Sequence, residues 1–149
     1  MIELLPARAA IADLIHTYAL NIRTGNGSRC VDLFTEDAFF EVREALVASG
    51  GAARTLSRLE GKHAIASYVS RTAAPQTRVC PFIYNLLIEV NDREATSNCL
   101  MTTLVWASGH QIVGEYHDSY RLEDRWRFSS RVFTILGEFS LTPVTASNR

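Results

Sequence analysis

The sequence predicts an α+β protein in which helices cover one face of an antiparallel sheet. Two observations predict it. Helical periodicity comes early in the chain, and four consecutive β-rich runs with short turns between them come last. This order favours a meander of strands packed against helices. A curved sheet closed by helices makes a cone with an apolar mouth, and such cavities commonly bind small molecules.

Composition and charge favour one domain spanning residues 1–149. A chain of 149 residues with 47% apolar residues suits a single core. We expect this core at about residues 7–139, followed by a polar tail at 143–149. The net charge is −1 and no block of like charge occurs, so neither nucleic acid nor a membrane is expected as a partner.

The cysteines and the N-terminus predict a cytoplasmic protein. Residues 1–8 do not have the pattern of a signal peptide. Three cysteines, Cys30, Cys80 and Cys99, are too few and too irregularly spaced for a disulfide framework. No metal or nucleotide motif occurs and the four histidines lack metal-ligand spacing, so we expect no cofactor.

The first half of the chain predicts two helices, a short helix between them and a strand pair. Residues 7–23 form an amphipathic helix, since apolar side chains recur on one stripe: Ile11, Leu14, Ile15, Tyr18 and Ile22. A short helix is expected at residues 28–34. Strands at 38–47 and 55–59 flank a turn at 48–52, and a helix at 62–73 ends before Pro75.

The second half predicts four long strands joined by short turns. The turns are expected at residues 91–93, 108–110 and 123–125. The β-rich runs between them are residues 79–90, 94–107, 111–122 and 126–136. The last two runs, with a charged turn between them, have the pattern of a hairpin.

The run at 111–122 carries the densest group of proton-transferring side chains. It places Tyr116, His117 and Asp118 side by side, so in a strand Tyr116 and Asp118 share one face and His117 takes the other. Asp118 could act as a base and Tyr116 as a donor to a substrate oxygen, because burial raises the pKa of an aspartate. Alternatively, Asp118 is structural and bonds an arginine such as Arg131. His117 would reach a substrate only through a β-bulge.

Arg23 also has two interpretations. At the end of a helix, a cation suits the C-terminal dipole. Alternatively Arg23 reaches into the cavity, where it holds a carboxylate or an enolate, or neutralises Asp118.

Six short motifs occur in order along the chain. They are Ile11-x-x-Leu14-x-x-x-Tyr18, Leu33-Phe34 before Asp37-Ala38, Gly61 to Ile65, Gly114-x-Tyr116-x-Asp118, Trp126 to Phe128, and Gly137 to Phe139. In these motifs the chain resembles the SnoaL-like members of the nuclear transport factor 2-like superfamily, and most of all its scytalone-dehydratase-like branch. The resemblance spans roughly residues 7–139 and implies an α+β cone, commonly dimeric, with a pocket between helices and sheet.

The functional residues of that family are not reproduced. By spacing, the family aspartate near the end of the first helix corresponds to Arg23. The first dehydratase histidine corresponds to Cys80, five residues before Asn85. The second corresponds to the region of residues 104–106. The resemblance therefore implies a related pocket with another set of groups.

We expect six residues to line the cavity, although aromatic and methionine side chains also occur as plain core. They are Tyr18, Phe40, Cys80, Asn85, Met101 and Trp106.

The leading functional hypothesis is a cofactor-independent dehydratase, isomerase or cyclase that acts on a small hydrophobic ring-containing ketone or a polyketide-like compound. Asp118, Tyr116, Arg23 and His117 are its candidate catalytic residues. One alternative is a non-catalytic binder of a hydrophobic molecule. Another is a structural subunit that resembles the β subunits of aromatic-ring-hydroxylating dioxygenases. A homodimer is expected because the last strand has apolar residues on both faces.

Overall fold

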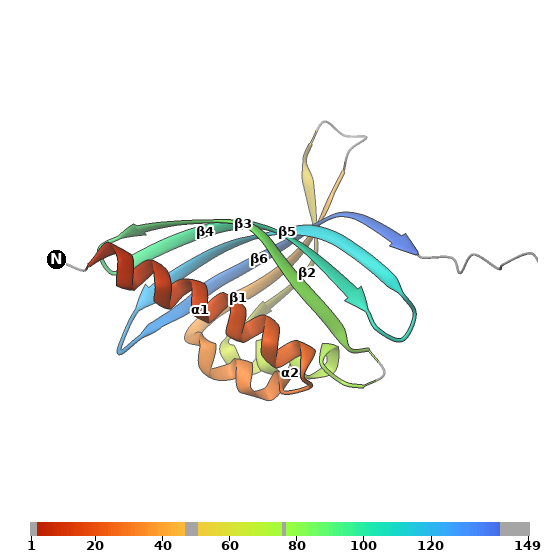
Figure 1. The fold of residues 1–149 in the computed structure, drawn as a ribbon, viewed down its shortest axis with the longest axis horizontal. Helices are drawn as coiled ribbons and strands as arrows, with labels where there is room; N and C mark the ends of the chain where they lie inside the picture. The colour runs from red at the N-terminus through yellow and green to blue at the C-terminus, as the bar shows by residue number, and fades with distance from the viewer. Residues whose placement is uncertain (1–2, 47–50, 76, 141–149) are drawn as a thin grey trace, which may run out of the picture.

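The computed structural model describes residues 3–46, 51–75 and 77–140 (Figure 1). The expected polar tail at 143–149 and most of the expected turn at 48–52 lie outside the described residues. No helix in the described part of the chain is long and apolar enough to cross a bilayer.

A six-stranded curved sheet forms the body of the molecule, in the order β2-β1-β6-β5-β4-β3 (Figure 1). Strands β3 to β6 form the predicted antiparallel meander, while β1 joins its edge in parallel with β6. This confirms the α+β prediction. The strands are β1 (Phe34–Ala45), β2 (Ala53–Glu60), β3 (Val79–Asn91), β4 (Glu94–Val105), β5 (His110–Leu122) and β6 (Trp126–Ser140).

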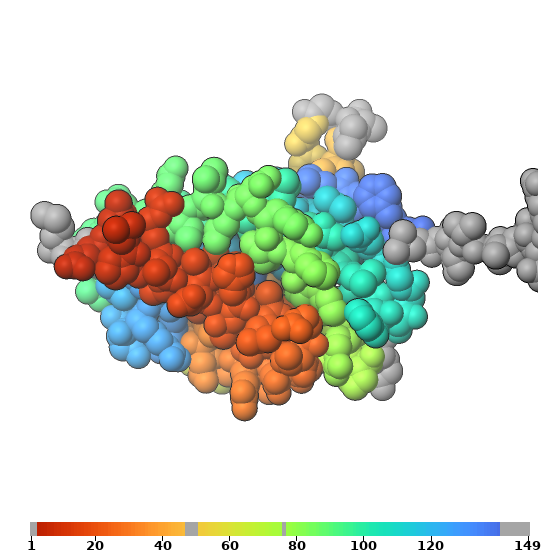
Figure 2. Space-filling model, viewed as in Figure 1, coloured from red at the N-terminus to blue at the C-terminus, as the bar shows by residue number. Residues whose placement is uncertain are grey.

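Two α-helices and one 3₁₀ helix lie against the concave face of the sheet. They are α1 (Leu4–Arg23), η1 (Gly27–Leu33) and α2 (Lys62–Thr72). Helix α1 crosses the viewed face together with β3 (Figure 2). Its buried stripe, which includes Ile11, Ile15 and Tyr18, is the one that the sequence predicted. Each such side chain contributes roughly 1.5–3 kcal/mol by leaving water.

The segment at 28–34 differs from its prediction. It forms a 3₁₀ helix that ends at Leu33, and Phe34 already belongs to β1. Phe34 is buried and stacks on Phe128 with ring centroids 5.1 Å apart. This contact between β1 and β6 draws the chain into the sheet four residues earlier than the predicted strand at 38–47.

Strand β4 shows how the sheet separates its two faces. Buried and accessible residues alternate along it, as expected for a strand with one covered face. Ser97, Cys99, Met101 and Thr103 face the helices. The side chains between them face outward. A residue of β3 or β5 that pairs directly with an inward residue of β4 lies on the same face of the sheet.

Candidate functional site

A cavity of about 150 Å³ lies between the helices and the concave face of the sheet. It is partly open, and apolar or aromatic side chains dominate its lining. Contributions come from α1, α2 and five strands: Tyr18, Ile22, Phe40, Tyr68, Thr72, Val79, Pro81, Met101, Thr103, Ile112, Tyr116 and Phe133.

Strand register explains why these particular side chains meet. Thr103 pairs with Pro81 on one side and with Ile112 on the other, so one row across three strands faces the cavity. Met101 lies two residues before Thr103 and therefore shares its face. On α1, Tyr18 and Ile22 are four residues apart and lie on one side of the helix.

Three tyrosines supply most of the polar atoms of the cavity. Burial raises the pKa of Tyr18, Tyr68 and Tyr116, so all three phenols stay protonated at neutral pH. A protonated phenol can donate a hydrogen bond to a ligand oxygen. The hydroxyl of Thr103 is buried and has no hydrogen-bond partner in the described part of the chain. The cavity thus combines an apolar wall with several unused donors.

A buried ion pair lies beneath the tyrosines. Arg131 of β6 donates from Nε to Oδ1 of Asp118 and from Nη2 to Oδ2, both at 2.9 Å. Both side chains are 0% exposed. The Tyr120 hydroxyl donates to Oδ2 at 3.2 Å and is itself 2.7 Å from the Ser97 hydroxyl. Asp118 therefore has its oxygens occupied by donors from the same sheet.

Aromatic rings surround the guanidinium of Arg131. Its Cζ lies 3.7 Å from the ring centroid of Tyr116, 4.3 Å from that of Tyr18 and 4.5 Å from that of Phe128. Such contacts are worth about 2 kcal/mol or more when the cation is desolvated. Arg131 Nη1 is buried without a hydrogen-bond partner among the described residues. Arg131 therefore packs against the rings of Tyr18 and Tyr116, two of the tyrosines that line the cavity, and stabilises their positions.

The charge of the pair is set by two opposing effects. Burial is the larger effect and raises the pKa of Asp118 above its ordinary value, although the charge and hydrogen bonds of Arg131 lower it. The carboxylate of Asp118 raises the pKa of Arg131 despite its burial. Because both oxygens of Asp118 accept N–H groups, the geometry is that of an ionised pair.

Three of the six expected lining residues, Tyr18, Phe40 and Met101, line the cavity and are buried. The candidate catalytic residue Tyr116 is also buried and lines it. Asp118 shares the inward face with Tyr116, as the strand pattern predicted, but it lies under the cavity and does not line it.

Four other candidates lie elsewhere, which corrects their assignment to the cavity, and the candidate His117 lies on the opposite face of β5, where the strand pattern placed it. Arg23 is exposed at the end of α1, and Trp106 is 72% exposed beyond the end of β4. His117 faces outward and its Nε2 lies 3.2 Å from Glu115. Asn85 is exposed at a bulge in β3, where its φ is 52°. Cys80 is buried, but its neighbours in the strand line the cavity, so alternation turns Cys80 away.

Sequence reasoning did not name eight of the twelve lining residues as part of the site. Tyr68, Thr103 and Phe133 are among them. Thr103 had a readable signal, because it lies two residues after Met101 and shares its face. Arg131 was considered only as a possible partner of Asp118.

A second, larger hollow of about 570 Å³ lies on the sheet near the β3–β4 turn. Its lining is largely polar and includes Glu89, Glu94 and Arg121. Among the residues that the structure describes, no three His, Cys, Asp or Glu side chains gather into a metal-binding group. We take the cavity under the helices as the candidate site, because its lining is mainly apolar with a few hydroxyl groups.

The model of the SnoaL-like domain matches residues 3–132. The chain belongs to the SnoaL-like family. A comparison with curated proteins finds no match.

Three solved structures from Novosphingobium aromaticivorans share the fold. An NTF2-like protein with a cystatin-like fold is 23% identical, with a TM-score of 0.71 and coverage of 89% of this chain and 84% of the other. A protein assigned as a scytalone dehydratase is 19% identical, with a TM-score of 0.71 and coverage of 93% and 89%. The β subunit of a protein assigned as an aromatic-ring-hydroxylating dioxygenase is 18% identical, with a TM-score of 0.71 and coverage of 89% and 91%. At these identities the likeness establishes the NTF2-like fold and not the activity.

Proposed function

We propose that this SnoaL-like protein binds a small hydrophobic, ring-containing ketone in the cavity under its helices. The observation that carries the proposal is a mainly apolar cavity whose lining includes tyrosine hydroxyls and the Thr103 hydroxyl, which has no partner among the described residues. The ring would lie against Phe40, Met101 and Phe133. The carbonyl would accept hydrogen bonds from Tyr116 and from its neighbours in the lining.

The lining favours binding over the base-catalysed reaction expected from the sequence. Its described residues include no carboxylate and no histidine. Asp118, the expected base, is engaged by Arg131 on both oxygens. A ligand in the cavity would therefore meet hydrogen-bond donors but no group that readily takes its proton.

Calorimetric titration with benzylacetone tests the proposal. We expect saturable binding, and we expect Tyr116→Phe to weaken it roughly threefold to tenfold because one hydrogen bond is lost. Tyr84→Phe is the matched control, since Tyr84 is exposed on the outer face of the sheet. Equal affinity of wild type and Tyr116→Phe for benzylacetone would show that the Tyr116 hydroxyl does not bind the ligand.

A second candidate is an isomerase or another lyase-like enzyme of the kind expected from the sequence. It is favoured by the position of Tyr116 over Arg131, whose charge lowers the phenol pKa against the effect of burial. Such a phenol would stabilise negative charge that develops on a ketone oxygen. Deuterium exchange into benzylacetone, followed by NMR, tests this. Exchange no faster than in buffer would exclude proton abstraction from this ketone and leave the binding proposal intact.

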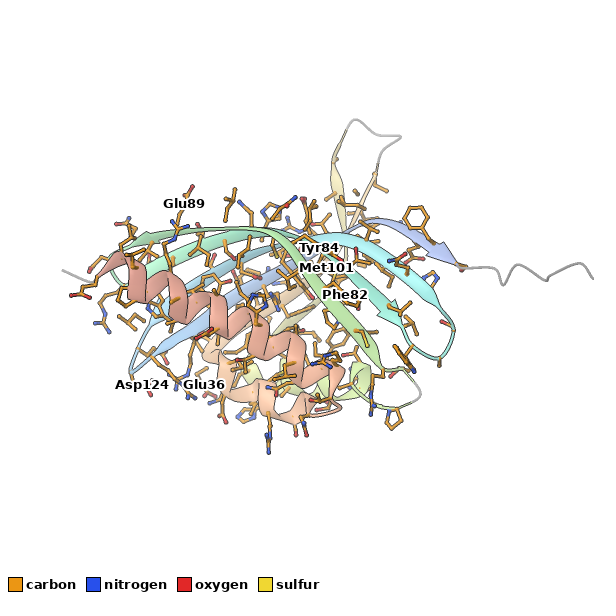
Figure 3. All side chains as sticks on the ribbon, in the orientation of Figure 1. Glu36, Phe82, Tyr84, Glu89, Met101 and Asp124 are labelled. Carbon is orange, nitrogen blue, oxygen red and sulfur yellow. The ribbon has the colours of Figure 1, made fainter. Side chains whose placement is uncertain are left out.

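We also propose that the chain forms a homodimer through the outer face of the sheet. Four large apolar side chains are exposed there: Phe82, Tyr84, Leu87 and Leu100. Tyr84 and Leu100 are direct cross-strand partners, and Phe82 lies on the same side of β3 (Figure 3 labels Phe82 and Tyr84). Exposed apolar patches often mark protein interfaces.

Light scattering on the purified chain tests the dimer. The expected mass is that of two chains, and Leu100→Arg should reduce it to one. A monomer at micromolar concentration would exclude the dimer. Co-purification with a larger chain would instead support the structural-subunit alternative.

A further inference from the structure

Three segments of the chain converge at one side of the cavity. The half-buried lining residues Thr72, Val79 and Pro81 lie there, and we call this side of the cavity its mouth. Helices α1 and α2 end there and β3 begins there, at the lower right of Figure 1. The residues just past α1 are close neighbours of those just past α2 and just before β3. A Cβ placed on Gly25 would lie 3.6 Å from the carbonyl oxygen of Ala73 and 2.9 Å from Nη2 of Arg78.

One arginine lies beside the mouth in each of these segments. Arg23 follows the lining residue Ile22, Arg71 precedes Thr72, and Arg78 precedes Val79. The segments 18–24, 68–82 and 101–112, which contribute most of the lining, contain these three arginines and one histidine but no aspartate or glutamate. We call Arg23, Arg71 and Arg78 the mouth arginines.

Carboxylates of the other lining strands have partners of their own or face outward. Glu41 of β1 is bound by Arg43 and Arg58. Glu115 of β5 lies beside His117 on the outward side of its strand. Glu138 of β6 is the cross-strand partner of the lining residue Ile112, and its Oε2 lies 3.4 Å from Nε2 of His110.

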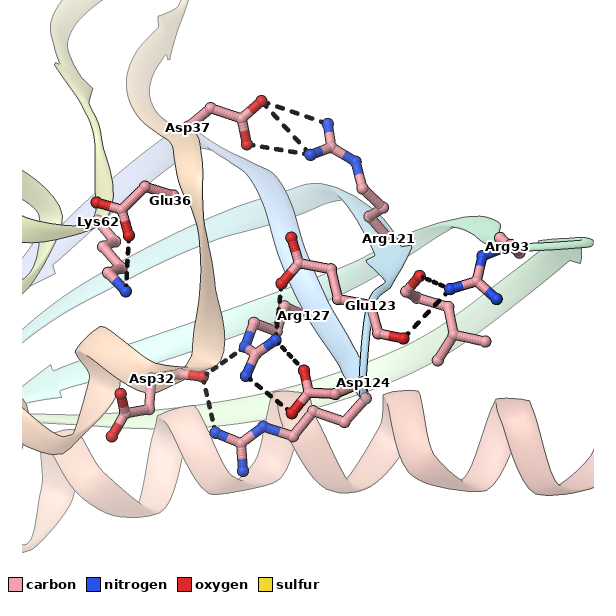
Figure 4. Close-up of polar contacts among 11 residues, drawn as sticks. Asp32, Glu36, Asp37, Lys62, Arg93, Arg121, Glu123, Asp124 and Arg127 are labelled. Atoms are coloured by element: carbon pink, nitrogen blue, oxygen red, sulfur yellow. Dashed lines mark hydrogen bonds and ion pairs between the residues drawn. The ribbon is translucent and has the colours of Figure 1, made fainter.

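Two arginines at the opposite end of the molecule form ion pairs, while Arg93 and Arg125 there donate to backbone carbonyls. Arg121 binds Asp37 at 3.1 Å, and Arg127 binds Glu123 at 2.7 Å and also Asp124 (Figure 4). The acidic side chains Glu89 and Asp124 lie toward the left end of the view in Figure 3, away from the mouth.

By contrast, no mouth arginine forms an ion pair within the described ranges. Arg71 donates to the Ser67 hydroxyl, and its guanidinium lies 5.9 Å from the ring centroid of Tyr68, a lining residue. Nε of Arg78 is buried and has no hydrogen-bond partner among the residues that the structure describes.

Helix dipoles account for only part of this charge. The C-termini of α1 and α2 each carry a partial charge of about −0.5, which suits Arg23 and Arg71. Together they offset about one of three positive charges. Arg78 lies in neither helix, so the dipoles do not explain it.

We propose that the natural ligand of the cavity is an aromatic or alicyclic carboxylate whose ring enters the cavity and whose carboxylate binds the mouth arginines, chiefly Arg78. This rests on the proposed function and adds the acid group to the ligand. A cavity of about 150 Å³ can hold a benzene ring, so the substituent of a single-ring compound must extend to the mouth. Guanidinium groups bind carboxylates with charge-assisted hydrogen bonds.

A matched pair of ligands tests the proposal by calorimetric titration. Hydrocinnamate and benzylacetone share the ring and the two-carbon linker, and differ in a carboxylate against a methyl ketone. We expect wild type to bind hydrocinnamate roughly tenfold more tightly, the gain of one charged hydrogen bond. Arg78→Gln and the exposed Arg71→Gln should remove this preference and leave benzylacetone affinity within twofold. Arg8→Gln, an exposed arginine at the other end of α1, is the control and should change neither affinity.

Each outcome separates this inference from the proposed function. Equal binding of both compounds would overturn the carboxylate preference and leave the ketone-binding cavity in place. Binding of neither would overturn both proposals. A preference for hydrocinnamate that Arg8→Gln reduces as much as Arg78→Gln would show a general charge effect and overturn the assignment to the mouth. Added salt should weaken hydrocinnamate binding and not that of benzylacetone.

Discussion

Replacement of Asp118 by asparagine tests the central feature of the structure, the buried pair with Arg131. Asp118→Asn keeps the shape of the side chain but removes its charge. Arg131 would then remain in a fully buried position without a counter-ion. We expect a large loss of stability, because an uncompensated buried charge is far less favourable than an ion pair.

The magnitude follows from the contacts of Asp118. Its carboxylate accepts two hydrogen bonds from Arg131 and one from Tyr120, and an asparagine oxygen can replace only part of this set. Breaking one partner of a buried pair destabilises a protein by about 3–5 kcal/mol. The stability of a typical domain is about 5–15 kcal/mol. The variant should therefore lose a large fraction of its total stability.

Urea denaturation followed by circular dichroism is the assay. With a slope of about 1–3 kcal/mol per molar urea, the midpoint should fall by more than one molar. Arg121→Gln is the matched control, since it breaks an exposed pair in which Arg121 and Asp37 are 44% and 68% exposed. Exposed pairs contribute at most about 1 kcal/mol.

A loss below about 1 kcal/mol in Asp118→Asn would refute the buried, ionised pair. The double variant Asp118→Leu with Arg131→Met removes both charges together. It should be more stable than Asp118→Asn, because no charge is left alone. It should still be less stable than wild type, because the ring contacts of Arg131 are lost.

Three further predictions concern a close contact, an acidic group and the buried phenols. Gly114→Ala should destabilise the protein by about 1–3 kcal/mol, since an added Cβ would lie 2.3 Å from the Phe133 ring. Gly137→Ala, whose Cβ would meet neighbours at 3.6 Å, should cost less in the same urea titration. Hydrogen bonds from Arg43 and Thr55 lower the pKa of Glu41 to about 2, below an unfolded value of about 4.3. Its ionised form therefore stabilises the protein above pH 5, so Glu41→Gln should destabilise at pH 7, and urea midpoints should converge with wild type as the pH falls toward 2. Ultraviolet titration should find the phenols of Tyr18, Tyr116 and Tyr120 protonated well above pH 10 until the protein unfolds, because burial raises their pKa values. Burial also raises the pKa of Tyr68 above its ordinary value.

The sequence predicted the meander and the shared face of Tyr116 and Asp118, because both depend on local periodicity. It could not decide the partner of Asp118, because that depends on a bulge. From the turn, Leu122 pairs with Trp126 and Tyr120 with Phe128, a register that would put Asp118 opposite Ser130. The register then shifts by one residue, so that Asp118 faces Arg131. A one-residue shift turns every later side chain to the other face.

Long-range packing explains the rest of what the sequence left open. Arg23 lies at the position where the family aspartate was expected, but no local pattern reports whether a helix-end side chain enters a cavity. Trp106 lies just past the end of a strand, and no local pattern reported whether its side chain enters the cavity. Tyr68 belongs to a helix whose position over the sheet is set by contacts with η1 and β1. Such positions follow from the assembled fold and not from spacing.

The buried pair also limits what chemistry the cavity can perform. If Asp118 took a proton from a ligand, Arg131 would be left buried and charged beside a neutral acid. That state would be less stable by an amount comparable to breaking the pair, about 3–5 kcal/mol. Added to a reaction barrier, this would slow proton abstraction by between about two and four orders of magnitude. Arg131 packs against the rings of Tyr116 and Tyr18 and holds them in place. The same guanidinium binds both oxygens of Asp118 and so opposes the use of that carboxylate as a base. A reaction in this cavity would have to use a proton acceptor on the ligand or in solvent, with the tyrosines stabilising charge on the ligand oxygen.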